Sequence, residues 1–215
     1  MTDAYTPALS TLVFTQDEVE AITAALATAS PWAVENMHIK SAKDKLREFH
    51  LQRHEDTCCY CRLNLHGAGH FMIDREHVLP KGTPRYKPFC YEAWNLSVSC
   101  KRCNMQFKGE DDDFFTDNSA SADFHDASNY LMIHPNYDEW ERHLSRQMEQ
   151  VNRKVLVKYA VVNDSGKGRY TYDYFELKEL EINSFYEAQG GESRLAPDAG
   201  EAAIETRTLA KAHGQ

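Results

Sequence analysis

The stretch that decides the fold begins with Cys58-Cys59-Tyr60-Cys61 and returns to the same pattern at Cys100-Lys101-Arg102-Cys103. Each stretch holds two cysteines separated by two residues, and two such pairs can supply four thiolates to a tetrahedral zinc ion. All six cysteines of the chain lie between residues 58 and 103, and in a cytoplasmic protein this clustering favours a metal over disulfides. The sequence therefore predicts a structural zinc ion, because a closed shell of four cysteines leaves no open position for chemistry. The predicted ligands are Cys58, Cys61, Cys100 and Cys103.

An alternative interpretation of these cysteines is a set of buried free thiols, since free cysteine is commonly buried. The identical spacing of both pairs favours the metal. Cys59 and Cys90 stand outside this spacing, and we do not expect them to be ligands. The 38 residues between the pairs exceed the roughly 15–20 of a simple zinc ribbon, so a further element must be inserted between them.

The insert and the residues after it carry three polar motifs. Residues 73–81 read Ile-Asp-Arg-Glu-His-Val-Leu-Pro-Lys, residues 94–100 read Trp-Asn-Leu-Ser-Val-Ser-Cys, and residues 104–109 read Asn-Met-Gln-Phe-Lys-Gly. A histidine of ordinary pKa can accept a proton from water at neutral pH, and a glutamate is a hard oxygen ligand suited to Mg²⁺ or Mn²⁺. Phosphodiester hydrolysis requires an activated water and a cation at the developing charge, so these residue types fit that reaction.

Taken in order, these motifs resemble the HNH, or ββα-metal, endonuclease family. The family pattern is an acidic residue followed by His, two residues and Pro; then Asn-Leu shortly before a Cys-x-x-Cys pair; then His or Asn directly after it, and a Lys further on. The resemblance covers roughly residues 58–109, about a quarter of the chain. It implies a short β-hairpin from about residue 71 to 96, followed by a helix from about Arg102, with the zinc knuckles joining the ends.

The resemblance also implies roles for particular residues. His77 would be the general base, Asn95 would orient its ring through a hydrogen bond, and Glu76 and Asn104 would bind a catalytic Mg²⁺ or Mn²⁺ ion. Many members carry Asp where this chain has Glu76, and Asn104 stands where others have His, so the preferred metal stays open. Lys81 and Lys108 are candidates for contacts to nucleic-acid phosphates, and Arg75 and Arg102 are weaker ones.

Each of these residues also has a plainer interpretation. Asn104 could cap a turn, and Lys108 followed by glycine is a common helix end. Asp74 is a possible further metal ligand, although its spacing does not match the acidic position of the family. Four other histidines are expected to be exposed loop residues or structural: His66, His70, His134 and His143.

Outside the central module, the sequence predicts an α+β protein with N-terminal helices and a C-terminal helix followed by a β-hairpin. A capping box at Thr15 predicts a first helix to about residue 28, and Ser30-Pro31 predicts the start of a second. Residues 41–54 suit a partly exposed helix and residues 138–148 another, while 154–162 and 169–177 suit the strands of a hairpin. The predicted parts are an N-terminal helical region at 1–55, the nuclease core at 56–110, a helix and hairpin region at 111–188, and a mobile tail at 189–215.

Charge and hydropathy bear on the partners of the protein. The formal net charge is −9, whereas residues 74–108 hold seven basic and three acidic residues, or about +4 locally. A basic site on an acidic chain suggests a nuclease that needs a partner to hold its substrate. No secretory signal and no apolar stretch of roughly 18 residues is present in the sequence, so we expect a cytoplasmic protein.

Two later segments, residues 131–144 and 168–183, are similar to small HNH effectors of bacterial anti-phage systems, such as Septu and some retron-linked operons. There the HNH protein accompanies an ABC-type ATPase, so the resemblance implies an ATPase partner and cleavage of DNA. The alternative interpretation of these segments is an ordinary helix and hairpin packed on the core. The competing functions are an RNA-cleaving HNH nuclease and a non-catalytic zinc-binding adaptor.

Overall fold

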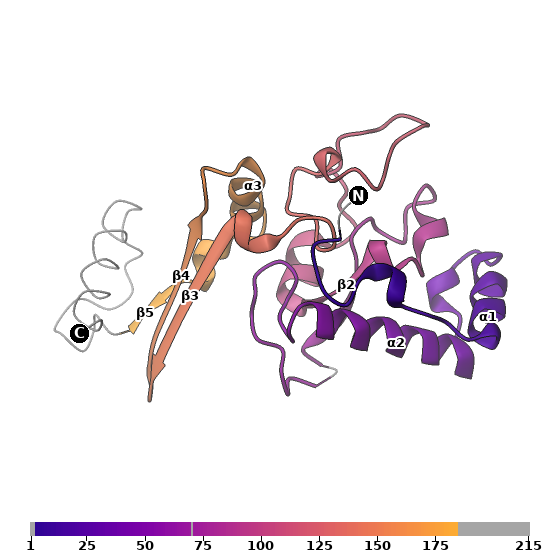
Figure 1. Cartoon of the computed structure of the whole chain (residues 1–215), viewed down its shortest axis with the longest axis horizontal. Coiled ribbons are helices and arrows are strands. Elements are labelled where there is room, and N and C mark those ends of the chain that lie inside the picture. Colours follow the sequence, from indigo (N-terminus) through magenta and orange to yellow (C-terminus); the bar gives the residue numbers. More distant parts are fainter. Residues whose placement is uncertain (1–2, 70, 185–215) are drawn as a thin grey trace. The chain divides into compact units, whose positions relative to one another are not determined.

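The computed structural model describes residues 3–69 and 71–184 of the chain (Figure 1). Helices and two small sheets occur together, which confirms the α+β class. Among the described residues, no helix has the length and apolar character that crossing a bilayer requires. The chain divides into two units, which in their described parts are residues 3–146 with 159–180, and residues 147–158 with 181–184.

The first helix, α1 (Gln16–Leu26), begins at the capping box that the sequence predicts. The Thr15 side chain accepts a hydrogen bond from the Glu18 backbone, and Glu18 Oε2 accepts one from the Thr15 backbone at 2.8 Å. Both bonds satisfy N–H groups that the first turn of a helix leaves without partners. The start of this helix is therefore a local property of its sequence.

The second helix, α2 (Met37–Arg53), confirms the helix predicted at 41–54 and begins four residues before it, because Asn36 is its cap and accepts hydrogen bonds from two backbone N–H groups. The helix start predicted at Ser30-Pro31 is wrong, because Pro31–Ala33 forms only a short 3-10 turn. The helix packs against β2, and α1 packs on α2 (Figure 1). Ile39 and Leu46 of α2 are buried in the shared core with Leu96 of the hairpin, which anchors the hairpin to the helices.

A two-stranded antiparallel sheet forms the centre of the first unit. Its strands are β1 (Ile73–His77) and β2 (Leu96–Cys100), with Ile73 opposite Cys100 and His77 opposite Leu96. The second strand thus starts where the sequence predicts the hairpin to end. Every residue of β2 is buried, as expected for a strand covered on both faces.

A helix of π type, Arg102–Lys108, follows β2 directly and stands where the sequence predicts a helix. The Gly109 N–H donates to the Asn104 carbonyl at 2.7 Å, a bond across five residues. Gly109 has φ +51° and ψ −122°, a backbone conformation that side chains with a Cβ rarely adopt. The glycine therefore ends the helix and turns the following residue back.

The segment after the hairpin corrects two predictions. Residues 138–148 do not form a helix: a 3-10 turn, Trp140–Arg142, leads into β3 (Leu144–Val151). Residues 169–177 do not form a strand, because α3 (Gly166–Tyr174) occupies most of them. The Ser165 side chain caps α3 by accepting a hydrogen bond from the Gly168 N–H at 3.1 Å. A cap of this kind allows a helix to begin within a sequence that is typical of a turn.

The second unit consists largely of strand residues. β4 (Lys154–Val161) confirms the strand predicted at 154–162, but it pairs with β3 and with the short β5 (Ile182–Asn183) rather than with residues 169–177. Within this unit Lys158 forms an ion pair with Glu181 at 2.5 Å. The tail predicted for residues 189–215 lies outside the described residues.

Candidate active site

Four thiols meet at the end of the hairpin where Cys100 closes β2. The Sγ atoms of Cys58, Cys61, Cys100 and Cys103 all lie within 4.8 Å of one another, and all four residues are buried. The Sγ atoms of Cys61 and Cys100 are 3.8 Å apart, which is far longer than a disulfide bond of about 2.05 Å. Four thiolates about 2.3 Å from a central zinc would lie roughly 3.8 Å apart, so this donor set fits a tetrahedral metal ion such as zinc.

A tight turn of the backbone holds the first pair of cysteines close together. The Arg62 N–H donates to the Cys58 carbonyl at 2.9 Å, and Arg62 adopts a left-handed φ of 55°, which closes a tight knuckle. Two distant side chains hold this knuckle: the Trp140 indole donates to the Tyr60 carbonyl at 3.0 Å, and the Tyr159 hydroxyl donates to the Cys61 carbonyl at 2.6 Å. The knuckle is therefore fixed by packing as well as by its own turn.

The thiol pKa shifts differ within the cluster: those of Cys58 and Cys100 are lowered, and those of Cys61 and Cys103 are raised by hydrogen bonds among the four thiols. Burial raises the pKa of Cys58, but hydrogen bonds from Cys100, Cys103 and other neighbouring thiols outweigh it and hold that pKa well below its ordinary value. Burial raises the pKa of Cys59 well above the ordinary value, so this thiol stays protonated. Position also sets Cys59 apart, because the four Sγ atoms that lie within 4.8 Å of one another belong to the other clustered cysteines.

His77 ends β1 and is held on two sides. Its Nε2 lies 3.1 Å from the Cys90 carbonyl, so Nε2 carries the proton and donates it to that oxygen. The ring packs edge-to-face on Trp32, with centroids 4.4 Å apart. Burial, reinforced by the charge of Lys81, lowers the pKa of His77 to about 3, so the imidazole is neutral at pH 7. The lone pair of Nδ1 is then free to accept a proton.

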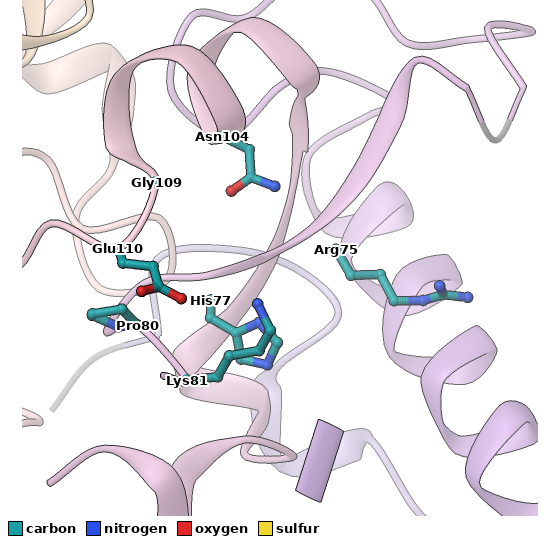
Figure 2. Close-up of a pocket in the computed structure, with 7 residues that line it drawn as sticks. All are labelled: Arg75, His77, Pro80, Lys81, Asn104, Gly109 and Glu110. Carbon is teal, nitrogen blue, oxygen red and sulfur yellow. The ribbon is translucent and has the colours of Figure 1, made fainter. Parts of the chain in front are cut away.

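The cavity beside His77 gathers side chains from three motifs (Figure 2). It measures about 30 Å³, room for roughly two water-sized groups. Figure 2 shows the Asn104 amide above the end of β1 and the Glu110 carboxylate directed toward His77 and Lys81, while Arg75 extends away toward α2. The lining residues are Arg75, His77, Pro80, Lys81, Asn104, Gly109 and Glu110.

Glu76 does not line this cavity, because side chains alternate along a strand. It points to the face of β1 that the π helix covers, where Oε1 accepts a hydrogen bond from the Tyr60 hydroxyl at 3.1 Å and lies 3.2 Å from Lys108 Nζ. Both charged side chains are at most 1% exposed. Burial raises the pKa of Glu76, against the opposing effect of the Lys108 charge.

Asn104, which lines the cavity, also contacts Asp74 of β1. The Asn104 amide donates to Asp74 Oδ2 at 3.1 Å, and Lys101 Nζ pairs with Asp74 Oδ1 at 2.7 Å. Asn104 Oδ1 therefore remains available as a ligand, whereas both oxygens of Asp74 have partners. A divalent ion bound in the cavity would meet the Asn104 side chain, whereas an ion at Glu76 would have to displace the buried ammonium of Lys108.

Asn95 fixes the backbone that follows His77 but does not hydrogen-bond to the His77 ring. The buried side chain accepts from the Leu79 N–H at 2.8 Å and donates to the Leu79 carbonyl at 3.2 Å. It thus clamps the residues after β1. The ring of His77 is oriented by the Cys90 carbonyl instead, which corrects the hydrogen bond expected from Asn95.

The four cations predicted to contact nucleic acid differ in whether they already have partners within the protein. Arg75 donates to the Lys43 carbonyl and to Asp44 of α2, and Arg102 donates to the Phe175 and Glu176 carbonyls. Lys108 is buried against Glu76. Lys81 is exposed and has no ion pair among the described residues, so the local positive charge available to a ligand is smaller than the sequence suggests.

Sequence reasoning missed two residues at this site. Trp32 supports the His77 ring from a segment far from the motifs, and nothing in its local sequence signals this contact. Glu110 is not among the site residues that the motifs predict, although its position directly after Gly109, at the end of the third motif, is a usable signal. His66 is exposed and pairs with Asp56, as expected of a loop residue, whereas His70 lies outside the described residues.

Two other histidines have structural partners. His134 is buried, accepts a hydrogen bond from the Asn136 N–H at 3.1 Å and stacks on Tyr137. His143 Nδ1 lies 2.7 Å from Ser165 Oγ, at the start of α3. Asn136, which lies within residues 131–144, donates to the Leu96 carbonyl at 2.8 Å, so this segment packs on the start of β2.

Comparison with known proteins gives no relative for this site. No family model, no curated protein and no solved structure matches the chain.

Proposed function

We propose that this protein is a metal-dependent phosphodiester hydrolase of the HNH type that cleaves DNA. The observation that supports this most directly is one small cavity lined by a neutral imidazole, an amide and an exposed ammonium group, those of His77, Asn104 and Lys81. The cavity lies beside a two-stranded hairpin that continues into a helix, next to a four-cysteine cluster. This combination supplies a base, an oxygen ligand and a phosphate contact in one place.

In the proposed reaction, His77 accepts the proton of the attacking water through Nδ1, because its Nε2 proton is committed to the Cys90 carbonyl. The water oxygen bonds to phosphorus as the bond from phosphorus to the leaving oxygen breaks. Lys81 contacts a non-bridging phosphate oxygen, and the negative phosphate raises the low pKa of His77 toward neutrality. A divalent ion held by Asn104 and a carboxylate would stabilise the charge on phosphate and leaving group.

The four clustered cysteines would bind zinc in a structural role. The β1–β2 hairpin has only two short strands, and a sheet of that size is marginally stable by itself. A zinc ion would join the knuckle at Cys58 to the end of β2 at Cys100, and its binding energy would add to the folding energy of the module.

A protein partner is part of the proposal. The net charge is −9, and three of the four predicted phosphate-binding cations are engaged inside the protein. Nucleic-acid affinity depends on free cations, so a second protein would supply most of the binding surface. We propose a cytoplasmic defence complex in which an ABC-type ATPase holds or gates the DNA and this chain cuts it, as the resemblance implies.

The test is cleavage of supercoiled plasmid by zinc-loaded protein with Mg²⁺ or Mn²⁺, with a parallel lane of total RNA. We expect His77→Ala to abolish cutting while its zinc content and far-UV spectrum stay at wild-type values. The matched control is His66→Ala, an exposed histidine that does not line the cavity and should leave cutting unchanged. Cutting that persists in His77→Ala, or zinc loss in that variant, would refute the proposal, and cutting confined to the RNA lane would replace DNA with RNA.

A further inference from the structure

We infer that Glu110, rather than Glu76, supplies the carboxylate ligand of the divalent ion at the Asn104 cavity. This inference rests on the proposed function, since it concerns the same site. Glu110 lines the cavity with His77 and Asn104, whereas Glu76 does not. The resemblance to HNH enzymes places the acidic ligand directly before the histidine, so the geometry of this chain departs from that expectation.

The surroundings of Glu76 argue against a metal ion there. The side chain is fully buried, and its neighbour Lys108, itself 1% exposed, already supplies a cation at 3.2 Å. A divalent ion at Glu76 would leave the Lys108 ammonium buried beside a second positive charge, which is strongly unfavourable. Asp74, the other carboxylate of β1, is paired with Lys101 and with Asn104.

The backbone brings Glu110 to the cavity. The five-residue hydrogen bond from Gly109 to Asn104 and the unusual dihedral angles of Gly109 turn the chain back toward β1. On the opposite side Gly82 leaves space, since a Cβ at that position would lie 2.8 Å from Glu110 Oε1. Two glycines thus allow the carboxylate to reach the loop after β1 (Figure 2).

The chemistry of the donors suits a hard cation. An amide oxygen and a carboxylate, with waters completing the shell, are the ligands that Mg²⁺ and Mn²⁺ take in phosphoryl-transfer sites. Within the described part of the chain, Glu110 forms no hydrogen bond or ion pair, not even with Lys81 across the cavity. The neighbouring acidic run is less available: the Tyr174 hydroxyl donates to Asp111 at 2.5 Å, and the Tyr86 hydroxyl donates to Asp112 at 2.8 Å.

The test measures Mn²⁺ affinity directly, by calorimetric titration of the zinc-loaded full chain, so that its outcome does not depend on nuclease activity. We expect Glu110→Gln to weaken Mn²⁺ binding by at least about tenfold, since loss of even an outer-shell partner costs that much. The matched control is Asp113→Asn, which removes the same charge from an exposed carboxylate three residues away and should bind like wild type. The double variant Glu76→Gln/Lys108→Met removes the buried pair together and should also retain binding.

Three outcomes would overturn the inference: wild-type affinity in Glu110→Gln, loss of binding in the double variant, or no Mn²⁺ binding by the wild-type chain at millimolar concentration. Loss of binding in Asp113→Asn with retention in Glu110→Gln would assign the ion to the acidic run. If Mn²⁺ binds through Glu110 but plasmid stays intact with every partner tested, the inference stands and the proposed nuclease function fails.

Discussion

Replacing Lys108 with methionine should destabilise the protein strongly at neutral pH and only weakly at pH 5. The substitution preserves most of the side-chain volume but leaves the Glu76 carboxylate buried without its cation. Breaking a buried ion pair by removing one partner costs about 3–5 kcal/mol, because the remaining charge is uncompensated. Glu76 Oε2 already lacks a hydrogen-bond partner among the described residues, so without Lys108 the carboxylate keeps the Tyr60 hydroxyl as donor but has no cation beside it.

Protonation sets the upper limit of this cost. A buried carboxyl without a cation can take up a proton instead of remaining charged. For an ordinary pKa of 4.5, protonating the group at pH 7 costs about 3.4 kcal/mol, because each pH unit above the pKa costs about 1.36 kcal/mol. The same step costs about 0.7 kcal/mol at pH 5. In the variant the folded state binds the proton more tightly than the unfolded state, so the free energy of unfolding must fall as the pH rises.

Urea unfolding of zinc-loaded protein at pH 5 and pH 7 measures both values. A loss of about 3 kcal/mol would lower the midpoint by at least about 1 M urea, because m is about 1–3 kcal/mol/M for small proteins. The double variant Glu76→Gln/Lys108→Met should recover most of the loss, because the amide oxygen introduced at position 76 can still accept the Tyr60 hydroxyl and no charge stays buried. A loss below about 1 kcal/mol at pH 7, or an equal loss at both pH values, would refute the buried-pair reasoning.

Two other predictions concern stability. Cys100→Ser should lose zinc and have a lower melting temperature, whereas Cys59→Ser should keep the wild-type zinc content. Colorimetric zinc release and thermal unfolding measure these two properties. A zinc-free Cys100→Ser variant with wild-type stability would contradict the structural role of the four-cysteine cluster. Burial raises the pKa of Glu18, but hydrogen bonds from Lys45, Ser41 and Thr15 outweigh it and lower that pKa to about 2. Because the folded pKa is depressed, Glu18 stabilises the fold above its ordinary pKa of 4.5 and this contribution is lost as the pH falls toward 2. In urea titrations, Glu18→Gln should therefore be less stable than wild type at pH 7 and equal to it near pH 2. The exposed control Glu48→Gln should have the stability of wild type at every pH. A constant difference between Glu18→Gln and wild type over this range would contradict the stabilising role of the ionised Glu18 carboxylate.

Local patterns predicted those features that depend on neighbours in the sequence. The capping box of Thr15 and Glu18 starts α1 as predicted, since both hydrogen bonds lie within one turn. The repeated two-residue spacing predicted that four thiols would meet, and they do. The helix predicted at 138–148 was wrong, because its later residues pair with β4 and a ladder of hydrogen bonds across strands has no counterpart in local periodicity.

The sequence by itself determined which residue types stand at the site: the cysteine pairs, His77 at the end of a strand, and Asn104 after the last cysteine. The tertiary structure decided what each group faces. Alternation along β1 separates His77 from Glu76, but which face meets the cavity and which meets Lys108 depends on how the π helix packs. The Cys90 carbonyl beside His77 and the Glu110 carboxylate over the cavity come from turns of the backbone, and a backbone carbonyl carries no signal in the sequence.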